Sequence, residues 1–116
     1  MVVLNQFMES YNKFNHLKIH TQYSICEGAL KISELSDFCK KNKIRAVGLS
    51  DTSNLCGALE FSENISKVGT QPILGTQINF KYKNEYGLLP LIAKTKKGYS
   101  SVVNLSSKSF LDNDDL

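Results

Sequence analysis

Four residues of this 116-residue sequence have side chains that could do chemistry and positions that could bring them together: His20, Glu27, Asp51 and Gln77. Each lies at or just beyond the end of a predicted strand, apart from Gln77, which lies within one. In parallel α/β folds the carboxyl ends of the strands meet at one edge, and working residues gather there. Histidine with carboxylates is the set a metal-assisted hydrolase needs to activate a water and neutralise phosphate charge.

A structural interpretation stays open for each of these residues. Asp51 could cap a helix, and His20 could be a hydrogen-bonded residue at a strand terminus. Gln77 is neutral and therefore a poor metal ligand. The residue types alone do not decide between a metal site and a set of structural polar groups.

Lys18 is the residue that argues most directly against a metal. It alternates with His16 and His20 along one strand face, so we expect it to point towards the same pocket. A protonated lysine repels divalent cations. It could instead pair with Asp51 or Glu27, or it could simply be a solvated residue at a strand end.

The elements that would position these residues follow an α/β pattern. Residues 14–20 alternate in polarity as a strand does, and residues 44–49 and 88–93 are short and largely apolar. Apolar residues recur at three- and four-residue steps in the predicted helices. The order is strand 14–20, helix 30–42, strand 44–49, helix 55–68 closed by Gly69, strand 72–80, strand 88–93 and helix 97–110. This order predicts parallel pairing for the early units.

Within the predicted helices, the spacing assigns a buried stripe to each. We expect burial of Ile32, Leu35, Phe38 and Cys39 in the first, of Leu55, Ala58, Leu59, Ile65 and Val68 in the second, and of Tyr99, Val102, Val103 and Leu105 in the last. The polar run 50–54 is expected to supply the cap of the second helix. Residues 1–13 are a lead-in, and the acidic tail 112–116 is expected to fray.

Composition is that of a soluble globular domain, with 41% hydrophobic and 22% charged residues and a net charge of +3. The basic residues form no long run, so a nucleic-acid patch is not favoured. Three cysteines without C-x-x-C spacing argue against a disulfide framework and a structural zinc site. No secretory signal or membrane-spanning run is visible, which favours the cytoplasm.

Several blocks of the sequence together resemble the PHP domain of bacterial replicative polymerases, the DNA polymerase III α subunits. HLKIHTQYS at residues 16–24 resembles the family's H-L-H-V-H-S-E-Y-S, and EGALKI at 27–32 resembles D-G-A-x-K-I. LSDTSNLCGALEF at 49–61 is similar to L-T-D-H-G-N-L-F-G-A-V-E-F, and QPILGTQ at 71–77 to K-P-I-I-G-C-E. LIA at 91–93, GY at 98–99 and LSSKS at 105–109 match a later stretch. The resemblance covers residues 14–111, which we take as a partial PHP domain.

The departures from the family motifs fall on the metal ligands. Lys18 stands where the H-x-H pair has its first histidine, Thr52 replaces the histidine of T-D-H-G, and Gln77 replaces the glutamate of G-C-E. His20, Glu27 and Asp51 keep counterparts. The resemblance therefore implies a branch whose PHP metal site is lost, with Lys18, His20, Glu27, Asp51, Thr52 and Gln77 as its vestigial positions. We expect no bound metal and no catalytic residue in this segment.

What the resemblance implies about fold and function follows from the family. The fold would be about the first half of a distorted (β/α)7 PHP barrel, with mostly parallel strands and outer helices. The parent would be a DNA-directed DNA polymerase, a nucleotidyltransferase that needs Mg²⁺ and contacts DNA through parts with no counterpart here. This segment would be a scaffold that docks the proofreading exonuclease subunit and other replicase subunits, without a cofactor or membrane of its own. Whether it is a truncated product or a fragment of a broken gene is left open.

Two other functions stay open. The first is an active metal-dependent PHP phosphoesterase, with proofreading or pyrophosphatase activity, using His20, Glu27 and Asp51. The second is a stand-alone α/β binding module unrelated to replication.

Overall fold

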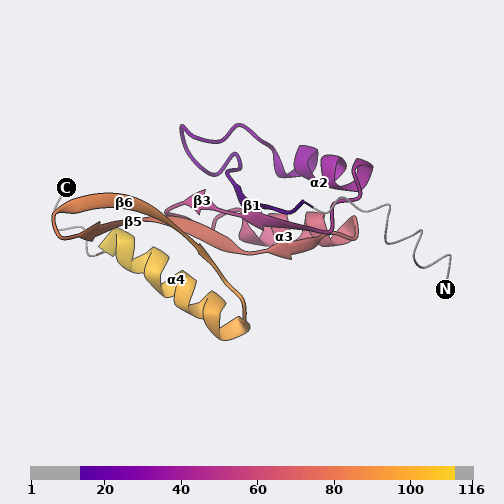
Figure 1. Ribbon diagram of the computed structural model, residues 1–116. Helices are drawn as coiled ribbons and strands as arrows, with labels where there is room; N and C mark the ends of the chain where they lie inside the picture. Colours follow the sequence, from indigo (N-terminus) through magenta and orange to yellow (C-terminus); the bar gives the residue numbers. More distant parts are fainter. Residues whose placement is uncertain (1–13, 112–116) are drawn as a thin grey trace.

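The computed structural model describes residues 14–111, in which strands and helices follow the predicted α/β order. The lead-in 1–13 and the acidic tail 112–116 lie outside the described residues. The elements are β1 (His16–Ile19), α2 (Ile32–Lys41), β2 (Ala46–Leu49), β3 (Asp51–Thr52), α3 (Ala58–Lys67), β4 (Gln71–Ile73), β5 (Gly75–Tyr82), β6 (Glu85–Ile92) and α4 (Lys96–Leu111). Figure 1 shows their arrangement along the chain.

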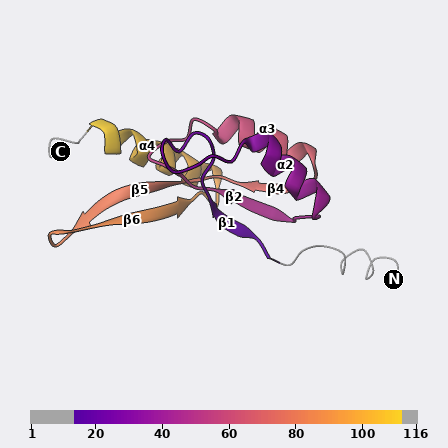
Figure 2. The ribbon, with the colours of Figure 1, turned by 90° about the horizontal axis from the view of Figure 1, so that it is seen from above.

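The first sheet has the strand order β1-β2-β4, and both pairings are parallel, as predicted. Figure 2 shows β1 and β4 on either side of β2. The pairing of β1 with β2 depends on Gly48, because a Cβ there would lie 2.7 Å from the carbonyl oxygen of Leu17. A larger residue at this position would separate the two strands.

The second sheet has the order β3-β5-β6 and is built mainly from a long hairpin. β3 pairs with β5 in parallel, and β5 pairs with β6 antiparallel over eight residues each. The hairpin turns at Lys83 and Asn84, whose φ values of 48° and 68° suit a tight two-residue turn. Pro90 lies in β6, an edge strand, where the missing N–H is tolerated.

The strand predicted over residues 72–80 is in fact two strands that belong to different sheets. β4 ends at Ile73 and β5 begins at Gly75. Between them, the carbonyl oxygen of Leu74 accepts a hydrogen bond of 2.8 Å from the N–H of Ala93. A Cβ at Gly75 would lie 2.2 Å from the Leu91 carbonyl oxygen, so this crossing of strands requires glycine.

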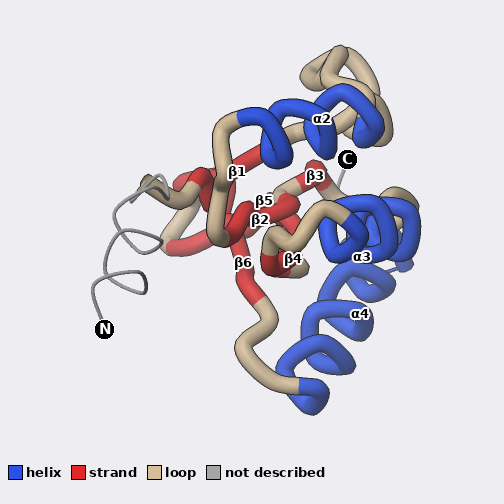
Figure 3. The backbone as a smooth tube through the Cα atoms, turned by 90° about the vertical axis from the view of Figure 1, so that its right-hand side faces the viewer, coloured by secondary structure: helices blue, strands red, loops and turns tan. Residues whose placement is uncertain are grey.

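The three helices form an arc along one side of the strands, as Figure 3 shows. α2 packs against α3, α3 packs against β4, and α4 packs against β5 and β6. The central core lies between α2, α3 and the first sheet. It consists of Ile32, Leu35, Cys39, Ile44, Val47, Leu49, Ala58, Phe61 and Ile65.

The buried stripes of the helices differ in part from prediction. Leu59 is 71% exposed and Phe38 is 48% exposed, whereas Phe61, which the spacing argument left out, is fully buried. In α4, Val102 is buried but Val103 and Leu105 are largely exposed. These exposed apolar residues also fit the three- and four-residue spacing of a helical stripe. The spacing alone does not decide which side of the stripe is buried, because that depends on the strands against which the helix packs.

The expected helix cap within residues 50–54 is wrong. The N-cap of α3 is Gly57, without a side-chain cap. Asn54 instead accepts a hydrogen bond of 3.1 Å from the N–H of Cys56, which forms a local turn before the helix. Asp51 is not a cap either, because it begins β3.

Within residues 14–111, every helix is too short or too polar to cross a lipid bilayer.

Candidate functional site

The site predicted from sequence centres on Asp51, whose side chain is fully buried. Asp51 Oδ1 accepts hydrogen bonds from the N–H of Thr21 at 2.6 Å and from Ser24 Oγ at 2.9 Å. Its other oxygen, Oδ2, accepts one from Thr21 Oγ1 at 2.7 Å. These three hydrogen bonds stabilise the buried carboxylate and offset much of the cost of taking its charge out of water.

Ser24 connects Asp51 to the rest of the site. Its hydroxyl gives its proton to Asp51 and accepts from the N–H of Thr52 at 3.0 Å. The Nδ1 atom of His20 lies 3.3 Å from the same oxygen. Because the Ser24 proton is already used, a hydrogen bond between these two residues requires His20 to carry its proton on Nδ1.

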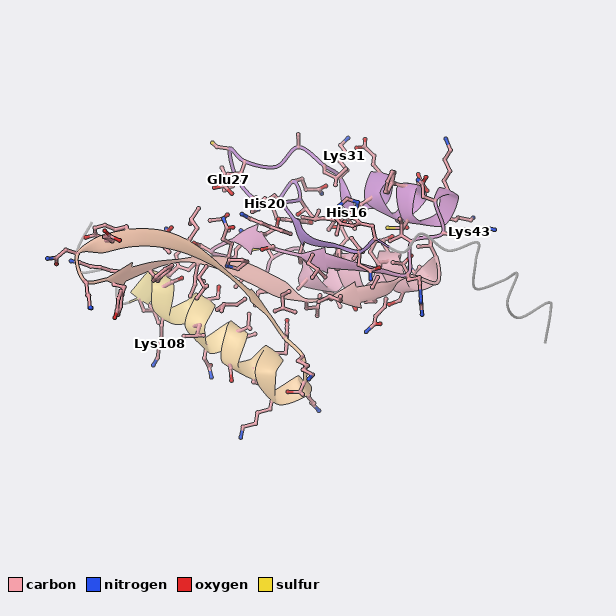
Figure 4. The ribbon with its side chains drawn as sticks, in the orientation of Figure 1. His16, His20, Glu27, Lys31, Lys43 and Lys108 are labelled. Carbon is pink, nitrogen blue, oxygen red and sulfur yellow. The ribbon has the colours of Figure 1, made fainter. Side chains whose placement is uncertain are left out.

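A second chain of hydrogen bonds joins Gln77, Thr52 and Glu27. The amide nitrogen of Gln77 donates to Thr52 Oγ1 at 3.3 Å, and Thr52 Oγ1 donates to Glu27 Oε2 at 2.5 Å. The same Glu27 oxygen lies 3.7 Å from His20 Nδ1. Figure 4 shows Glu27 and His20 on the same side of the sheet, in the loop after β1. Five of the six predicted positions are thus brought together.

Lys18 is the exception. It is exposed on β1, and among the described residues it forms no ion pair with Asp51 or Glu27. The predicted pairing is therefore not made, because hydroxyl and backbone donors already occupy the carboxylate oxygens.

Two residues that hold the site were missed from the sequence, Thr21 and Ser24. Both are buried in the loop after β1, and both donate to Asp51. Their only signal is a pair of small hydroxyl residues three positions apart directly after a strand, which also occurs in ordinary loops.

A tyrosine attaches the same loop to α3. The Tyr23 hydroxyl donates to Glu60 Oε2 at 2.6 Å, and the Tyr23 carbonyl accepts from the Asn54 amide at 2.9 Å. The hydrogen bond to the Glu60 carboxylate, together with its negative charge, raises the pKa of Tyr23 above its usual value. The ring packs closely over Gly57, where a Cβ would lie 2.6 Å from it.

With this geometry established, the comparisons with known proteins identify the family. The family model for the PHP domain matches residues 16–115, most of the chain. The chain belongs to the PHP family. Its PHP residues are 40% identical to a DNA polymerase III subunit alpha of Rickettsia felis over 103 residues, which is 88% of this chain and 8% of the relative. They are 34% identical to the corresponding subunit of Haemophilus influenzae over 106 residues, 89% of this chain and 9% of that one.

A solved structure shares the fold of this PHP chain. It is a Bifidobacterium adolescentis protein described as a metal-dependent phosphoesterase, with a TM-score of 0.61 and 18% identity. The match covers 81% of this chain and 34% of that one, so the architecture here is that of a partial PHP barrel. The chain thus spans less than a tenth of the length of these two polymerase relatives and about a third of its structural neighbour.

The PHP site described above does not fit a cluster of metal ions. Within residues 14–111 no three His, Cys, Asp or Glu side chains gather closely enough to hold one. The buried carboxylate of Asp51 already accepts three hydrogen bonds from the protein, and Thr52 and Gln77 are neutral. Only His20 and Glu27 remain as adjacent donors, and two ligands are too few for a metal centre.

The buried side chain of Gln77 has a polar atom without a hydrogen-bond partner. It is 2% exposed, and its Oε1 atom has no hydrogen-bond partner. Exchanging the two amide atoms would not help, because the Thr52 proton is already directed at Glu27.

Proposed function

We propose that this chain is a non-catalytic PHP scaffold of the DNA polymerase III α type. Relatives with this name match most of the chain, which supports the assignment. In a parent of that kind, DNA-directed polymerase activity, its Mg²⁺ requirement and DNA contacts would belong to other parts of the protein. The parent would be a cytoplasmic nucleotidyltransferase.

The buried carboxylate of Asp51, which already accepts three hydrogen bonds from the protein, is the observation that carries the non-catalytic assignment. All three hydrogen bonds to Asp51 come from inside the protein, and they occupy most of the acceptor sites that this carboxylate could offer to a metal ion. A metal ion would therefore compete with Thr21 and Ser24 for the Asp51 oxygens. The residues left, His20 and Glu27, would hold an ion only weakly.

The docking role proposed for the scaffold concerns the proofreading exonuclease subunit and other replicase subunits. Leu59 on α3 supports it, because this large apolar side chain is 71% exposed on an outer helix. We expect Leu59→Asp to weaken binding of the cognate exonuclease subunit at least about tenfold in isothermal titration calorimetry. Glu63→Gln, an exposed change on the same helix, serves as the control. Equal binding by both variants would place the docking surface elsewhere.

Metal content after dialysis against zinc and manganese tests the non-catalytic assignment. Elemental analysis of the purified chain should give well below one equivalent of either metal. Two or three tightly bound equivalents would instead favour the alternative function, a metal-dependent PHP phosphoesterase. The proximity of His20 and Glu27, at 3.7 Å, is the observation that favours this alternative.

A further inference from the structure

The turn of the β5–β6 hairpin (residues 79–87) carries three exposed aromatic side chains that take no part in the site. Phe80, Tyr82 and Tyr86 are 41%, 64% and 74% exposed. Every residue from 79 to 86 is exposed, so both faces of the two-stranded ribbon are accessible there. Figures 1 and 2 show this turn at the end of the molecule away from α2 and α3. Exposed apolar surface gathered in one place marks an interaction site.

Phe80 and Tyr82 form an aromatic platform on one face of β5. They are two residues apart, so their side chains point to the same side of the sheet. Phe80 lies opposite Gly87 in the register, and a Cβ at Gly87 would lie 2.9 Å from the Phe80 ring. The ring therefore takes the space that a side chain at position 87 would fill. It is still 41% exposed, so a flat group can stack on it.

Two lysines hold their charges beside the aromatic rings of the hairpin turn. The ammonium group of Lys83 lies 5.2 Å from the centroid of the Tyr82 ring. On the opposite face of the ribbon, the ammonium group of Lys81 lies 5.3 Å from the centroid of the Tyr86 ring. Among the described residues neither lysine forms an ion pair. Glu85 also lies in the turn, and two lysines against one glutamate leave an excess of positive charge.

A ligand for this surface must offer flat groups to the rings and negative charge to the lysines. Single-stranded nucleic acid offers both, because its unpaired bases are free to stack and each nucleotide carries a phosphate. A duplex keeps its bases paired inside the helix and offers mainly its phosphates to such a surface. A protein partner with an apolar surface would bury two lysine charges without counter-charges, which is costly. The chemistry of the turn therefore favours a single strand.

We propose that the hairpin turn binds single-stranded nucleic acid, with bases stacked on Phe80 and Tyr82 and phosphates beside Lys83. Lys81, on the opposite face, adds to the attraction for the phosphates. The basic residues form no long run in the sequence, and it is the pairing of β5 with β6 that gathers charge and rings in one place. This inference does not rest on the proposed function. It adds a nucleic-acid contact of this segment to those expected in other parts of a parent protein.

Fluorescence anisotropy with the full chain gives the first test. Labelled oligothymidylate and oligouridylate of about 12 nucleotides, a length within the site sizes of single-strand binders, should both bind more tightly than a DNA duplex of the same length. Both single strands carry the bases and phosphates that the turn would recognise, and the tighter of the two identifies DNA or RNA as the source. No binding to either single strand, or equal binding to the duplex, would overturn the proposal.

Ring and charge variants test the assigned contact. Phe80→Leu combined with Tyr82→Leu keeps apolar cover over Gly87 but removes the rings, so the Kd should rise about fivefold or more. Lys81→Gln combined with Lys83→Gln should also raise the Kd. This lysine variant should lower the slope of log Kd against log salt by about 0.7 or more, the value for one phosphate contact on a single strand. Unchanged binding by either double variant would overturn the assigned contact.

Matched changes on α2 serve as controls, and circular dichroism checks that every variant is folded. Phe38→Leu removes an exposed ring, and Lys40→Gln combined with Lys41→Gln removes the same charge as the hairpin lysine variant. Both should bind like the parent. Equal losses in the α2 and hairpin lysine variants would assign binding to net charge alone and overturn the contact. Light scattering that gave two chains for the parent but one for the ring variant would show a second copy on the rings, which also overturns it.

Discussion

Asp51 and Thr21 are joined by two hydrogen bonds, one to each carboxylate oxygen: the Thr21 N–H donates to Oδ1 at 2.6 Å and the Thr21 hydroxyl donates to Oδ2 at 2.7 Å. The pair connects the end of β1 to the start of β3, 30 residues later in the chain. A residue whose position suggests metal chemistry here holds two strand ends together.

Asp51→Asn tests this structural role. The asparagine amide would direct a donor at one of the hydroxyl or backbone donors, leaving buried groups unpaired. We expect the free energy of unfolding to fall by about 1.5–3 kcal/mol, the usual range for hydrogen bonds to a charged group. Urea denaturation followed by circular dichroism measures it. Asp37→Asn, an exposed change on α2, should stay within about 0.5 kcal/mol of the parent. Equal stability of the two variants would contradict the anchoring role.

Restoring ligands should restore metal affinity. The triple variant Lys18→His, Thr52→His and Gln77→Glu restores the family's ligand types at the three positions where this sequence departs from it, so we expect it to bind more zinc or manganese than the parent. Elemental analysis after dialysis gives the stoichiometry. A variant with the same three changes at exposed positions, Lys40→His, Thr95→His and Gln71→Glu, controls for added histidines. Equal metal content in the two triple variants would show that the ligand positions are mapped incorrectly.

The raised pKa of Tyr23 makes a prediction about alkaline pH. The hydrogen bond to Glu60 favours the neutral phenol, so the folded-state pKa exceeds the unfolded value of about 10. The stabilisation is therefore complete below about pH 10 and is lost as the pH rises through the folded-state pKa. Ultraviolet titration, as the difference between the parent and Tyr23→Phe, should place Tyr23 ionisation above that of a free tyrosine. Glu60→Gln should lower it, and an unchanged titration in that variant would show that Glu60 is not the cause.

Gly28 should not tolerate a side chain. A Cβ there would lie 2.1 Å from the carbonyl oxygen of Thr21, a backbone atom that cannot move without breaking the loop that holds Asp51. Gly28→Ala should lower the free energy of unfolding by about 2 kcal/mol, within the range for overpacking. Gly98→Ala makes the same chemical change inside α4, where alanine is the better helix former, and should be neutral or stabilising. If both variants lost stability equally, crowding at Thr21 would not be the reason.

The prediction from sequence was most successful where a single period decides the structure. The alternation in residues 14–20 and the apolar run 44–49 predict the strands observed as β1 and β2, and their parallel pairing follows from the helix between them. The division of the predicted strand 72–80 could not be read in the same way. It depends on the contact of Leu74 and Gly75 with the returning strand β6, which is far away in sequence.

The site shows the same limit more sharply. Residue types at converging strand ends located four of its positions, His20, Glu27, Asp51 and Gln77, and the family resemblance added Thr52. The partners of those residues depend on the course of the loop 20–28, where Cys26 adopts a φ of 65°. A short loop of small polar residues has many conformations of similar energy, and only its contacts with Asp51 and Glu60 select one. Lys18 does not pair with Asp51, because Thr21 and Ser24 of this loop already donate to the Asp51 carboxylate.

The burial of Gln77 has a consequence for how this protein can change over generations. A carboxylate at that position alone would be a buried charge without a cation, and an imidazole at Thr52 alone would remove the hydroxyl that now links Gln77 to Glu27. Each single substitution towards a charged, metal-binding pair at these two positions therefore gives a less stable protein than the present pair of Thr52 and Gln77. The hydrogen-bonded Gln77 amide and Thr52 hydroxyl therefore resist single substitutions. Selection for stability alone keeps the side chains at positions 52 and 77 uncharged.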